Sequence, residues 1–527
     1  MNSKGNHYIL IICLIFGFLF RIATINQSFW VDEFLTINAM RNSFLFFSRF
    51  QIFYFMEHLF ILLSEKEWIV RLPSLIFGLF SIILTYYCVR KEFDSITANI
   101  SIILLTINNI HIYYSQDARP YSLFYLFSTA TYFALVMFFK KKTHYSLIIY
   151  LVMSLLSFNA HLFAVIMIVG NILSVLIYFF LLIVIGKIHI RSIIKRLTPK
   201  LLIYYIVIFV LIILFIIISM DTRLIKEKYP ETYKFLSSNF LLYIFKGYSN
   251  CKISSFYIYL IFAIIGLLFM FKKYFNFTLI ILGQIIVTFV MFFINVHRPI
   301  FGRYYIYLLP LYLISIAYGM KSISFAVVTL FARSNFFGNI KNAITALVVV
   351  LVIMQSTFGL RMALLPSNEN FRDTLKIINV VGDSSQPIIF YPHYYEDGIK
   401  HYLQQKNELI FIEDVNNKEK IGEITKSSPV AWAIGVLTRK KFDTLLQQVN
   451  FKKLTMSGII GNEIELWVKY PIDNEEKRRR YEISFGEAVV QFMPSKEGFI
   501  NLGFIYEKYG MLEAQKIMYQ KAQEFSK

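Results

Sequence analysis

The stretch that decides the fold class is residues 121–142. The sequence is YSLFYLFSTATYFALVMFF from Tyr121 to Phe139 and then continues with Lys140-Lys141-Lys142. Nineteen residues without a charged side chain form a helix about 28 Å long, which matches the hydrocarbon core of a bilayer. A lysine cluster directly after such a segment is typical of its cytoplasmic end. The stretch therefore predicts a transmembrane helix whose C-terminal end faces the cytoplasm.

Similar apolar stretches recur along the first 361 residues, which predicts an all-α polytopic membrane protein. The first stretch has no small-x-small cleavage site after it, so we interpret it as an uncleaved span rather than a signal peptide. Hydropathy places about eleven transmembrane helices, near residues 8–25, 72–89, 95–114, 121–139, 145–162, 163–184, 201–219, 255–271, 276–295, 304–320 and 341–361.

The charge distribution favours a membrane protein over a nucleic-acid-binding protein. The chain of 527 residues has a net charge of +20, with 57% hydrophobic and 16% charged residues. Of its 33 acidic residues, 22 follow residue 361, and none lies between 118 and 220 or between 232 and 368. Acid-free blocks suit segments in lipid, where a charge is costly. We therefore expect membrane lipids, and no nucleic acid, as partners.

The basic residues orient the expected spans, because they cluster in alternate loops. By the positive-inside rule those loops are cytoplasmic, and the remaining loops face outward. An odd number of spans then places the C-terminal region on the outer face. We expect a multi-pass protein of a bacterial plasma membrane, since the chain lacks an endoplasmic-reticulum retrieval signal. The basic clusters are Arg90-Lys91, Lys140–Lys142, Lys187–Lys200, Lys272-Lys273 and Lys321–Lys341.

The composition changes after the membrane domain, residues 1–365, and residues 366–472 predict an extracytoplasmic soluble α/β domain. Short buried strands and amphipathic helices alternate there, as in small α/β units. The strands are expected at 387–391, 409–412, 430–436 and 463–468, and the helices at 371–380 and 440–449.

Residues 473–527 predict a charged linker and a short helical tail that resembles a tetratricopeptide repeat. One and a half repeats are too few to stand alone, so the tail should dock on the neighbouring domain or on a protein partner. An ordinary pair of helices is the simpler interpretation. The signature offsets of the repeat are matched by Phe499, Leu502, Gly503, Tyr506, Gly510, Tyr519 and Ala522.

Three expected outer loops carry charged side chains next to the membrane surface. Asp32 and Glu33 follow the first span, Asp117 and Arg119 lie in a tight turn, and Arg303 precedes a later span. A carboxylate there could act as a general base or bind a metal, and an arginine could bind a phosphate with two hydrogen bonds. Solvated charge pairs, and arginines that snorkel to lipid headgroups, are the simpler interpretations.

Together these motifs resemble the membrane glycosyltransferases of the C superfold. More narrowly, they resemble the family of dolichyl-phosphate-mannose protein mannosyltransferases and bacterial aminoarabinose lipid A transferases. The relatives' His-Pro-Pro turn after the Asp-Glu motif is missing here. The motifs that carry the resemblance are Trp30-Val-Asp-Glu33, Arg71-Leu-Pro-Ser-Leu-Ile-Phe-Gly78, the run from Ile110 to Tyr121, and Gly302-Arg-Tyr304 with the later Pro310.

The resemblance implies transfer of one hexose or pentose from a polyprenyl-phosphate donor to a protein, lipid or glycan acceptor, with inversion at the anomeric carbon. Asp32 is implied as the general base, with Glu33 orienting it or binding a divalent metal ion, the one cofactor left open. Asp117 is implied to orient the acceptor or to pair with Arg119, and Arg119 and Arg303 are implied to hold the donor phosphate.

Other interpretations stay open. His161 lies at the outward end of an expected span. It is a candidate to contact the acceptor or a metal, and a structural role is the simpler interpretation. A transporter or flippase of lipid-linked sugars would also bind these lipids, although such proteins place polar sites near mid-membrane. A catalytically inactive scaffold is the remaining alternative, and the missing Pro pair favours it.

Overall fold

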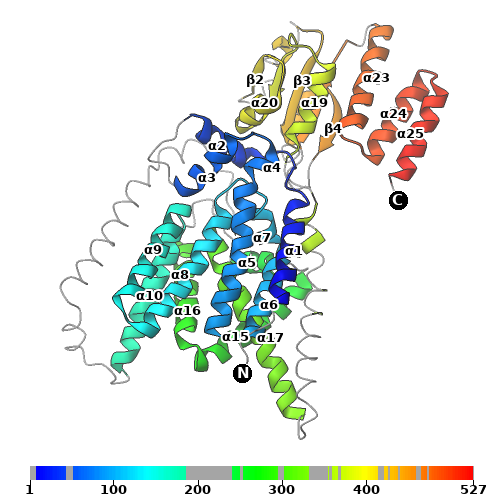
Figure 1. Ribbon diagram of the computed structural model, residues 1–527. Coiled ribbons are helices and arrows are strands. Elements are labelled where there is room, and N and C mark those ends of the chain that lie inside the picture. The colour runs from blue at the N-terminus through cyan, green and yellow to red at the C-terminus, as the bar shows by residue number, and fades with distance from the viewer. Residues whose placement is uncertain are drawn as a thin grey trace. The chain divides into compact units, whose positions relative to one another are not determined.

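A computed structural model gives the architecture of the chain (Figure 1). Its N-terminal part is a group of long helices, and its C-terminal part combines a small sheet with helices. The structure describes residues 7–42, 51–184, 240–249, 253–294, 302–331, 350, 354, 359–361, 363–365, 369–412, 421–424, 428–436, 440–457, 464–471 and 474–525.

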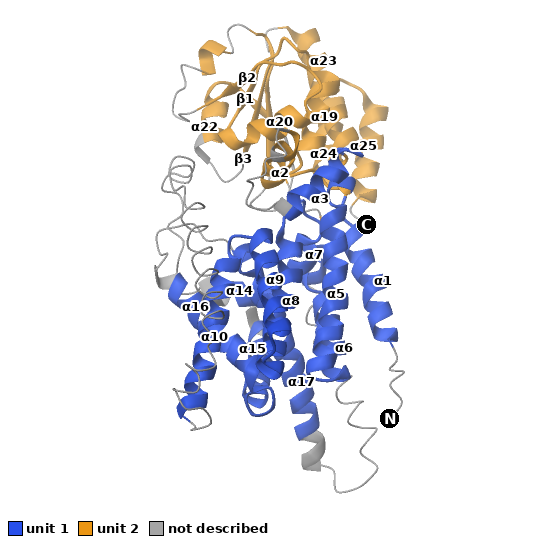
Figure 2. Cartoon of the chain, turned by 60° about the vertical axis from the view of Figure 1, so that its left-hand side comes forward, with its two compact units in different colours: residues 1–25, 43–65, 69–364 blue, residues 26–42, 66–68, 365–527 orange. Residues whose placement is uncertain are grey.

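The chain folds into two compact units (Figure 2). Unit 1 comprises residues 1–25, 43–65 and 69–364, and unit 2 comprises residues 26–42, 66–68 and 365–527. Unit 2 therefore includes two short segments that precede most of the expected spans in the sequence. One of them contains Asp32 and Glu33.

Unit 1 is built from apolar helices. In the described part of the chain, five helices are long and apolar enough to cross a membrane, and five apolar helices are shorter. The helices of unit 1 are α1 (Tyr8–Ile22), α3 (Gln51–Ile61), α5 (Leu72–Glu92), α6 (Ser95–Thr106), α7 (Asn109–Tyr114), α8 (Tyr121–Lys141), α9 (His144–Ala160), α10 (Ala164–Val184), α14 (Phe240–Tyr248), α15 (Ile253–Lys273), α16 (Phe275–Ile294), η1 (Gly302–Leu308) and α17 (Leu309–Phe331).

The described helices coincide with most of the expected spans, which confirms a polytopic helical architecture. The spans expected at 201–219 and 341–361 lie outside the described residues or largely so, and the number eleven stays a prediction. One expected span, 95–114, is divided into α6 and α7. Asn108 caps α7 by accepting a hydrogen bond from the His111 amide at 3.0 Å, so a new helix begins there.

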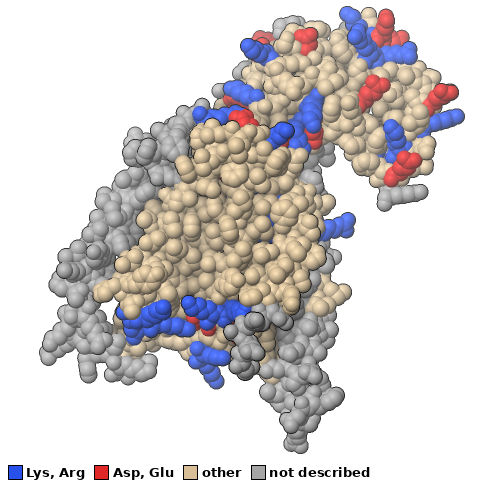
Figure 3. Space-filling model, in the orientation of Figure 1, with Lys and Arg blue, Asp and Glu red and all other residues tan. Residues whose placement is uncertain are grey.

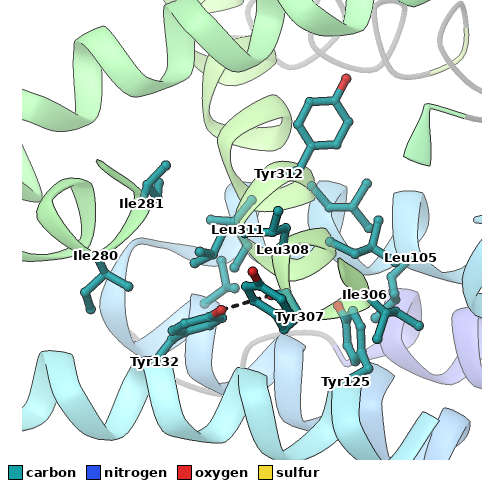
Figure 4. Close-up of a cluster of buried hydrophobic side chains, with 14 of the residues drawn as sticks. Leu105, Tyr125, Tyr132, Ile280, Ile281, Ile306, Tyr307, Leu308, Leu311 and Tyr312 are labelled. Carbon is teal, nitrogen blue, oxygen red and sulfur yellow. Dashed lines mark hydrogen bonds between the residues drawn. The ribbon is translucent and has the colours of Figure 1, made fainter. Parts of the chain in front are cut away.

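Tyrosines join the helices in the interior of unit 1. The Tyr132 hydroxyl of α8 donates to the backbone oxygen of Tyr307 in η1 at 3.1 Å, as Figure 4 shows. The hydroxyls of Tyr307 and Thr288, a residue of α16, lie 2.9 Å apart. Apolar side chains such as Leu105 and Ile306 surround this point. These bonds tie η1 to α8 and α16, and so fix the segment that follows Arg303.

One end of unit 1 is cationic. Figure 3 shows Lys and Arg side chains along one edge of this unit, below a broad surface without charged groups. Lys140, near the end of α8, pairs with Glu92 at 2.8 Å. Lys321 of α17 pairs with Asp94 just before α6. The ends of α5 and α8 therefore meet α6 and α17 at one end of the bundle, as expected for a cytoplasmic face.

Unit 2 contains a five-stranded sheet with the order β2-β1-β3-β5-β4. The first three strands along the chain pair in parallel, and β5 pairs antiparallel with β3 and β4. The strands are β1 (Ile388–Phe390), β2 (Leu409–Phe411), β3 (Ala431–Val436), β4 (Lys452–Ser457) and β5 (Ile464–Lys469). The other elements before the tail are α2 (Val31–Asn42), α19 (Phe371–Val381), η2 (His393–Tyr395), α20 (Glu396–Tyr402) and α22 (Lys440–Gln448). The short helix α4 (Glu67–Val70) begins in unit 2 and ends in unit 1.

Four strands and two helices of this domain lie where the sequence predicts them. The sequence did not predict β4, since Lys452-Lys-Leu-Thr-Met-Ser457 lacks an apolar run. It is an edge strand, and lysines are common on edges because they hinder pairing with another chain.

The tail consists of α23 (Glu475–Phe492), α24 (Lys496–Lys508) and α25 (Leu512–Glu524). The expected charged linker was wrong, because residues 475–480 form the first turns of α23 behind the Asn474 cap. Phe485 of α23 packs on Trp432 of β3 with ring centroids 5.2 Å apart. The tail therefore docks on the α/β domain of its own chain. Its assignment as a tetratricopeptide repeat stays a prediction.

Glu482 joins the tail to the sheet. Its carboxylate accepts hydrogen bonds from the Tyr470 hydroxyl at 3.1 Å and from Arg478 Nε at 3.1 Å. It also accepts from Lys508 Nζ at 2.6 Å and from the Tyr509 hydroxyl at 2.8 Å. Burial alone would raise the pKa of Glu482, but these donors lower it to about 2. The ionised carboxylate therefore stabilises this joint.

Replacing Glu482 by Gln is expected to destabilise unit 2. Hydrogen bonds to a charged group contribute roughly 1–3 kcal/mol, so the unfolding temperature of the full chain in detergent should fall by a few degrees at pH 7. A group whose folded pKa is lowered contributes stability above its ordinary pKa, and this is lost as the pH falls. The difference from wild type should therefore shrink from pH 4.5 to about pH 2. The exposed Glu513→Gln is the matched control, and equal unfolding temperatures for both variants at pH 7 would contradict the assignment.

Candidate active site

One group of predicted site residues lies in unit 1, in the turn at residues 115–120, which is fixed against the end of α1. Gln116 Nε2 donates to the backbone oxygen of Phe20 at 2.8 Å, and Gln116 Oε1 accepts from the Thr24 hydroxyl at 2.9 Å. The Arg119 amide donates to the backbone oxygen of Asp117 at 2.7 Å and closes the turn. Asp117 is buried, whereas Arg119 is half-buried. Two of the predicted site residues are thus held in a rigid turn.

Helix α5 supports the same turn at close range. A Cβ on Gly78 would lie 2.3 Å from Ser115 Oγ, so only a glycine allows this approach. The Ser74 hydroxyl donates to the backbone oxygen of Arg119 at 3.3 Å. Both residues belong to the motif 71–78 that the resemblance singled out, so this motif positions the turn.

Arg21 is a buried polar residue near this turn that the prediction missed. It lies in α1, fully buried, and its Nη2 is 2.6 Å from His111 Nδ1. Its Nη1 donates to the backbone oxygen of Gly17 at 2.9 Å. The signal was present in the sequence, since an arginine within an apolar helix is a functional candidate by default. The contact to His111 ties α1 to α7, directly before the turn.

His161 lies in the turn between α9 and α10 and is enclosed by aromatic rings. It stacks on Phe124 with centroids 5.0 Å apart, and Tyr121 lies 5.4 Å away. Tyr304, the neighbour of Arg303, lies at 5.5 Å. The Phe163 amide donates to His161 Nδ1 at 3.2 Å, which assigns the proton of the neutral ring to Nε2. The beginnings of α8 and η1 therefore meet at His161.

Arg119, His161 and Arg303 are brought together by these contacts. Burial, followed by the positive charges of Arg119 and Arg303, lowers the pKa of His161 to about 3. Both guanidinium groups therefore lie close enough to act on the imidazole, which stays neutral near pH 7. Two arginines beside a neutral N–H donor form a site suited to a phosphate.

This arginine site lies one helix length away from the cationic end of unit 1. Helix α8 begins at Tyr121 beside the site and ends at Lys141, after 21 residues. With a rise of 1.5 Å per residue its length is about 31 Å, close to the thickness of a bilayer core. The site therefore lies at the end of α8 opposite its lysine-rich end, where the sequence predicts an outer loop.

A separate group of predicted site residues, Asp32 and Glu33, belongs to unit 2. Both residues lie in the first turn of α2, where the sequence predicted a loop. Glu33 is fully buried, and its Oε2 accepts a hydrogen bond from the Trp30 amide at 3.2 Å. Glu33 therefore stabilises the beginning of α2. Asp32 is half-buried beside it.

Glu369 is a third carboxylate in this part of unit 2, and no sequence pattern marks it as a site residue. Its Oε2 accepts a hydrogen bond from the Val31 amide at 3.3 Å. Burial and the negative charges of Asp32 and Glu33 raise the pKa of Glu369 to about 7, although the hydrogen bond from the Val31 amide lowers it. Three carboxyl groups therefore lie close enough for electrostatic repulsion around the beginning of α2.

The described residues offer no metal centre. Among them, no group of three or more His, Cys, Asp or Glu side chains has the arrangement to hold a metal ion. Glu33 and Glu369 each accept a backbone hydrogen bond instead. The divalent metal stays a prediction.

Comparison with known proteins identifies the fold. A family model described as dolichyl-phosphate-mannose-protein mannosyltransferase matches residues 50–218. No curated protein matches the sequence.

Solved structures match over most of the chain. ArnT from Cupriavidus metallidurans in the apo state has a TM-score of 0.52 at 11% identity, covering 87% of this chain and 97% of that one. The same protein bound to undecaprenyl phosphate gives 0.51 at 12% identity, with the same coverage. The oligosaccharyltransferase AglB from Archaeoglobus fulgidus, with an inhibitory peptide and a dolichol-phosphate, gives 0.50 at 12%, covering 88% and 74%. The chain therefore has the C-superfold architecture of membrane glycosyltransferases and resembles the dolichyl-phosphate-mannose protein mannosyltransferase family, which confirms the resemblance drawn from its motifs.

Proposed function

We propose that the protein transfers a sugar from a polyprenyl-phosphate donor to an acceptor at the outer face of the membrane. The observation that carries this proposal is the meeting of Arg119, His161 and Arg303 at one end of an apolar helix bundle. A lipid tail in the bilayer would present its phosphate at that depth. Structures with related folds contain undecaprenyl phosphate and dolichol-phosphate.

The reaction assigns a task to each charged group. The acceptor hydroxyl oxygen attacks C1 of the sugar, and Asp32 takes the hydroxyl proton. The bond between C1 and the phosphate oxygen breaks, and the polyprenyl phosphate leaves with the bonding electrons. Arg119 and Arg303 stabilise the negative charge on the leaving phosphate. Attack opposite the leaving group inverts the anomeric carbon.

The remaining predicted residues support these groups. Asp117 orients the acceptor from the turn that also holds Arg119. His161, a neutral donor through Nε2, binds the donor phosphate or the acceptor rather than a metal, since Phe163 occupies its Nδ1. Glu33 holds the first turn of α2 and thereby orients Asp32. The C-terminal domain lies on the outer face, and the acceptor is a protein, lipid or glycan.

Turnover of defined donors tests the proposal. Farnesyl phosphate linked to mannose, glucose, galactose or 4-amino-4-deoxyarabinose is added to membranes that carry the full chain. At least one donor should release farnesyl phosphate in step with the gain of its sugar by a membrane acceptor, followed by mass spectrometry. Membranes without the chain are the control. Movement of an intact sugar lipid across the bilayer, without release of farnesyl phosphate, would instead support a flippase.

A further inference from the structure

The segment that leads to Asp32 is bonded to the C-terminal domain within unit 2. The Phe29 amide donates to the Tyr402 hydroxyl at 3.0 Å, and the Val31 amide donates to Glu369 at 3.3 Å. Arg372 Nη1 donates to the backbone oxygen of Asn26 at 2.8 Å. The backbone between residues 26 and 31 therefore finds partners on three side chains that lie more than 300 residues later in the sequence.

Glu67 connects two of these side chains. Its Oε1 accepts from Arg372 Nη1 at 2.9 Å and from the Tyr402 hydroxyl at 2.9 Å. Glu67 is buried, Tyr402 is half-buried, and the Arg372 side chain is 26% exposed. Because Tyr402 donates to Glu67 and accepts from Phe29, its hydroxyl proton and lone pair are both used. One network thus joins α4, α19 and α20 to the segment before α2.

Aromatic packing holds the first turns of α2 on the same domain. Phe34 is buried, and its ring lies 5.6 Å from Phe371 and 5.5 Å from His401, between centroids. A Cβ on Gly398 would lie 2.8 Å from Phe34, so a glycine is needed for α20 to approach this closely. Asp32 therefore lies between two anchored points, the hydrogen-bonded segment 26–31 and the packed ring of Phe34.

We infer that Glu369, Arg372 and Tyr402 are positioning residues that hold Asp32 in place for the transfer reaction. The inference rests on the proposed function. A general base must lie within hydrogen-bonding reach of the proton it removes, and a displacement of about 1 Å costs about a hundredfold in rate. Loss of one anchor should therefore lower kcat while the donor still binds.

Tyr402→Phe is the test variant, since it removes one oxygen atom and keeps the ring. In the full chain, hydrogen–deuterium exchange of peptides covering 27–34 should rise about tenfold, and kcat with the farnesyl-phosphate sugar should fall about 10- to 100-fold. The donor KM should change less than twofold. Tyr394→Phe, on a half-exposed ring of η2, is the matched control and should change neither. Arg372→Gln removes a second anchor and should repeat both effects.

Two results would overturn the inference. Unchanged exchange at 27–34 in Tyr402→Phe would mean that the hydroxyl does not hold the segment. Raised exchange with unchanged kcat would mean that the held segment does not serve the reaction. A wild-type chain that transfers no sugar would overturn the proposed function itself, and is recognised separately because the exchange measurement needs no substrate.

Discussion

Replacing Asp32 by Asn is expected to abolish sugar transfer while the protein still folds and inserts into the membrane. The amide has nearly the shape of the carboxylate but does not accept a proton, so the acceptor hydroxyl would attack without a base. General base catalysis contributes about 10²- to 10⁴-fold to a rate. Initial rates with the farnesyl-phosphate sugar, at equal amounts of folded protein, measure the loss.

The matched control for this substitution is Asp383→Asn. Asp383 is an exposed aspartate of unit 2, and it accepts a hydrogen bond from the Ser385 amide. This variant should keep the wild-type rate. Near-normal turnover by Asp32→Asn would remove Asp32 from the role of base.

Arg303→Ala is expected to weaken use of the lipid-phosphate donor more than use of the acceptor. Arg303 lies at the beginning of η1, beside the aromatic site around His161. A charge-assisted hydrogen bond contributes about 1.5–3 kcal/mol, so the donor KM should rise about 10- to 100-fold. The acceptor KM should stay within about twofold.

Arg90→Ala controls for loss of a positive charge at the membrane surface. Arg90 lies in the last turn of α5, where it donates to the Tyr86 hydroxyl at 2.8 Å. It belongs to the cationic end of unit 1, so its loss should leave the donor KM unchanged. An unchanged donor KM in Arg303→Ala would count against a phosphate site there.

The helices of unit 1 could be predicted because their signal is local. In a bilayer, the backbone of a long uncharged run can form hydrogen bonds only within itself, so the nineteen residues 121–139 specify a helix. The ends of these helices then place the turn 115–120, His161 and Arg303 at the same end of the helix bundle. The division at Asn108 was missed, because hydropathy carries little information about the cap that begins α7.

In unit 2, local sequence patterns predict the elements but not the contacts between distant segments. The sequence predicted Asp32 and Glu33 as a site. It did not predict that the backbone of residues 26–31 before them is hydrogen-bonded to Glu369, Arg372 and Tyr402, which depends on contacts across more than 300 residues. The first turns of α23 could have been predicted, since Asn474 is a favourable cap and Glu475 and Glu476 are favourable in a first turn. Their charge suggested a linker instead.

Mass spectrometry of cell-surface glycans and glycolipids measures directly whether the protein transfers a sugar in the cell and whether this transfer needs Asp32. Cells are compared with the wild-type chain, without it, and with Asp32→Asn. We predict that one glycan or glycolipid species loses a single hexose or pentose without the chain and equally with Asp32→Asn. Identical spectra from all three cells would contradict the account, as would a sugar that disappears without the chain but is restored by Asp32→Asn.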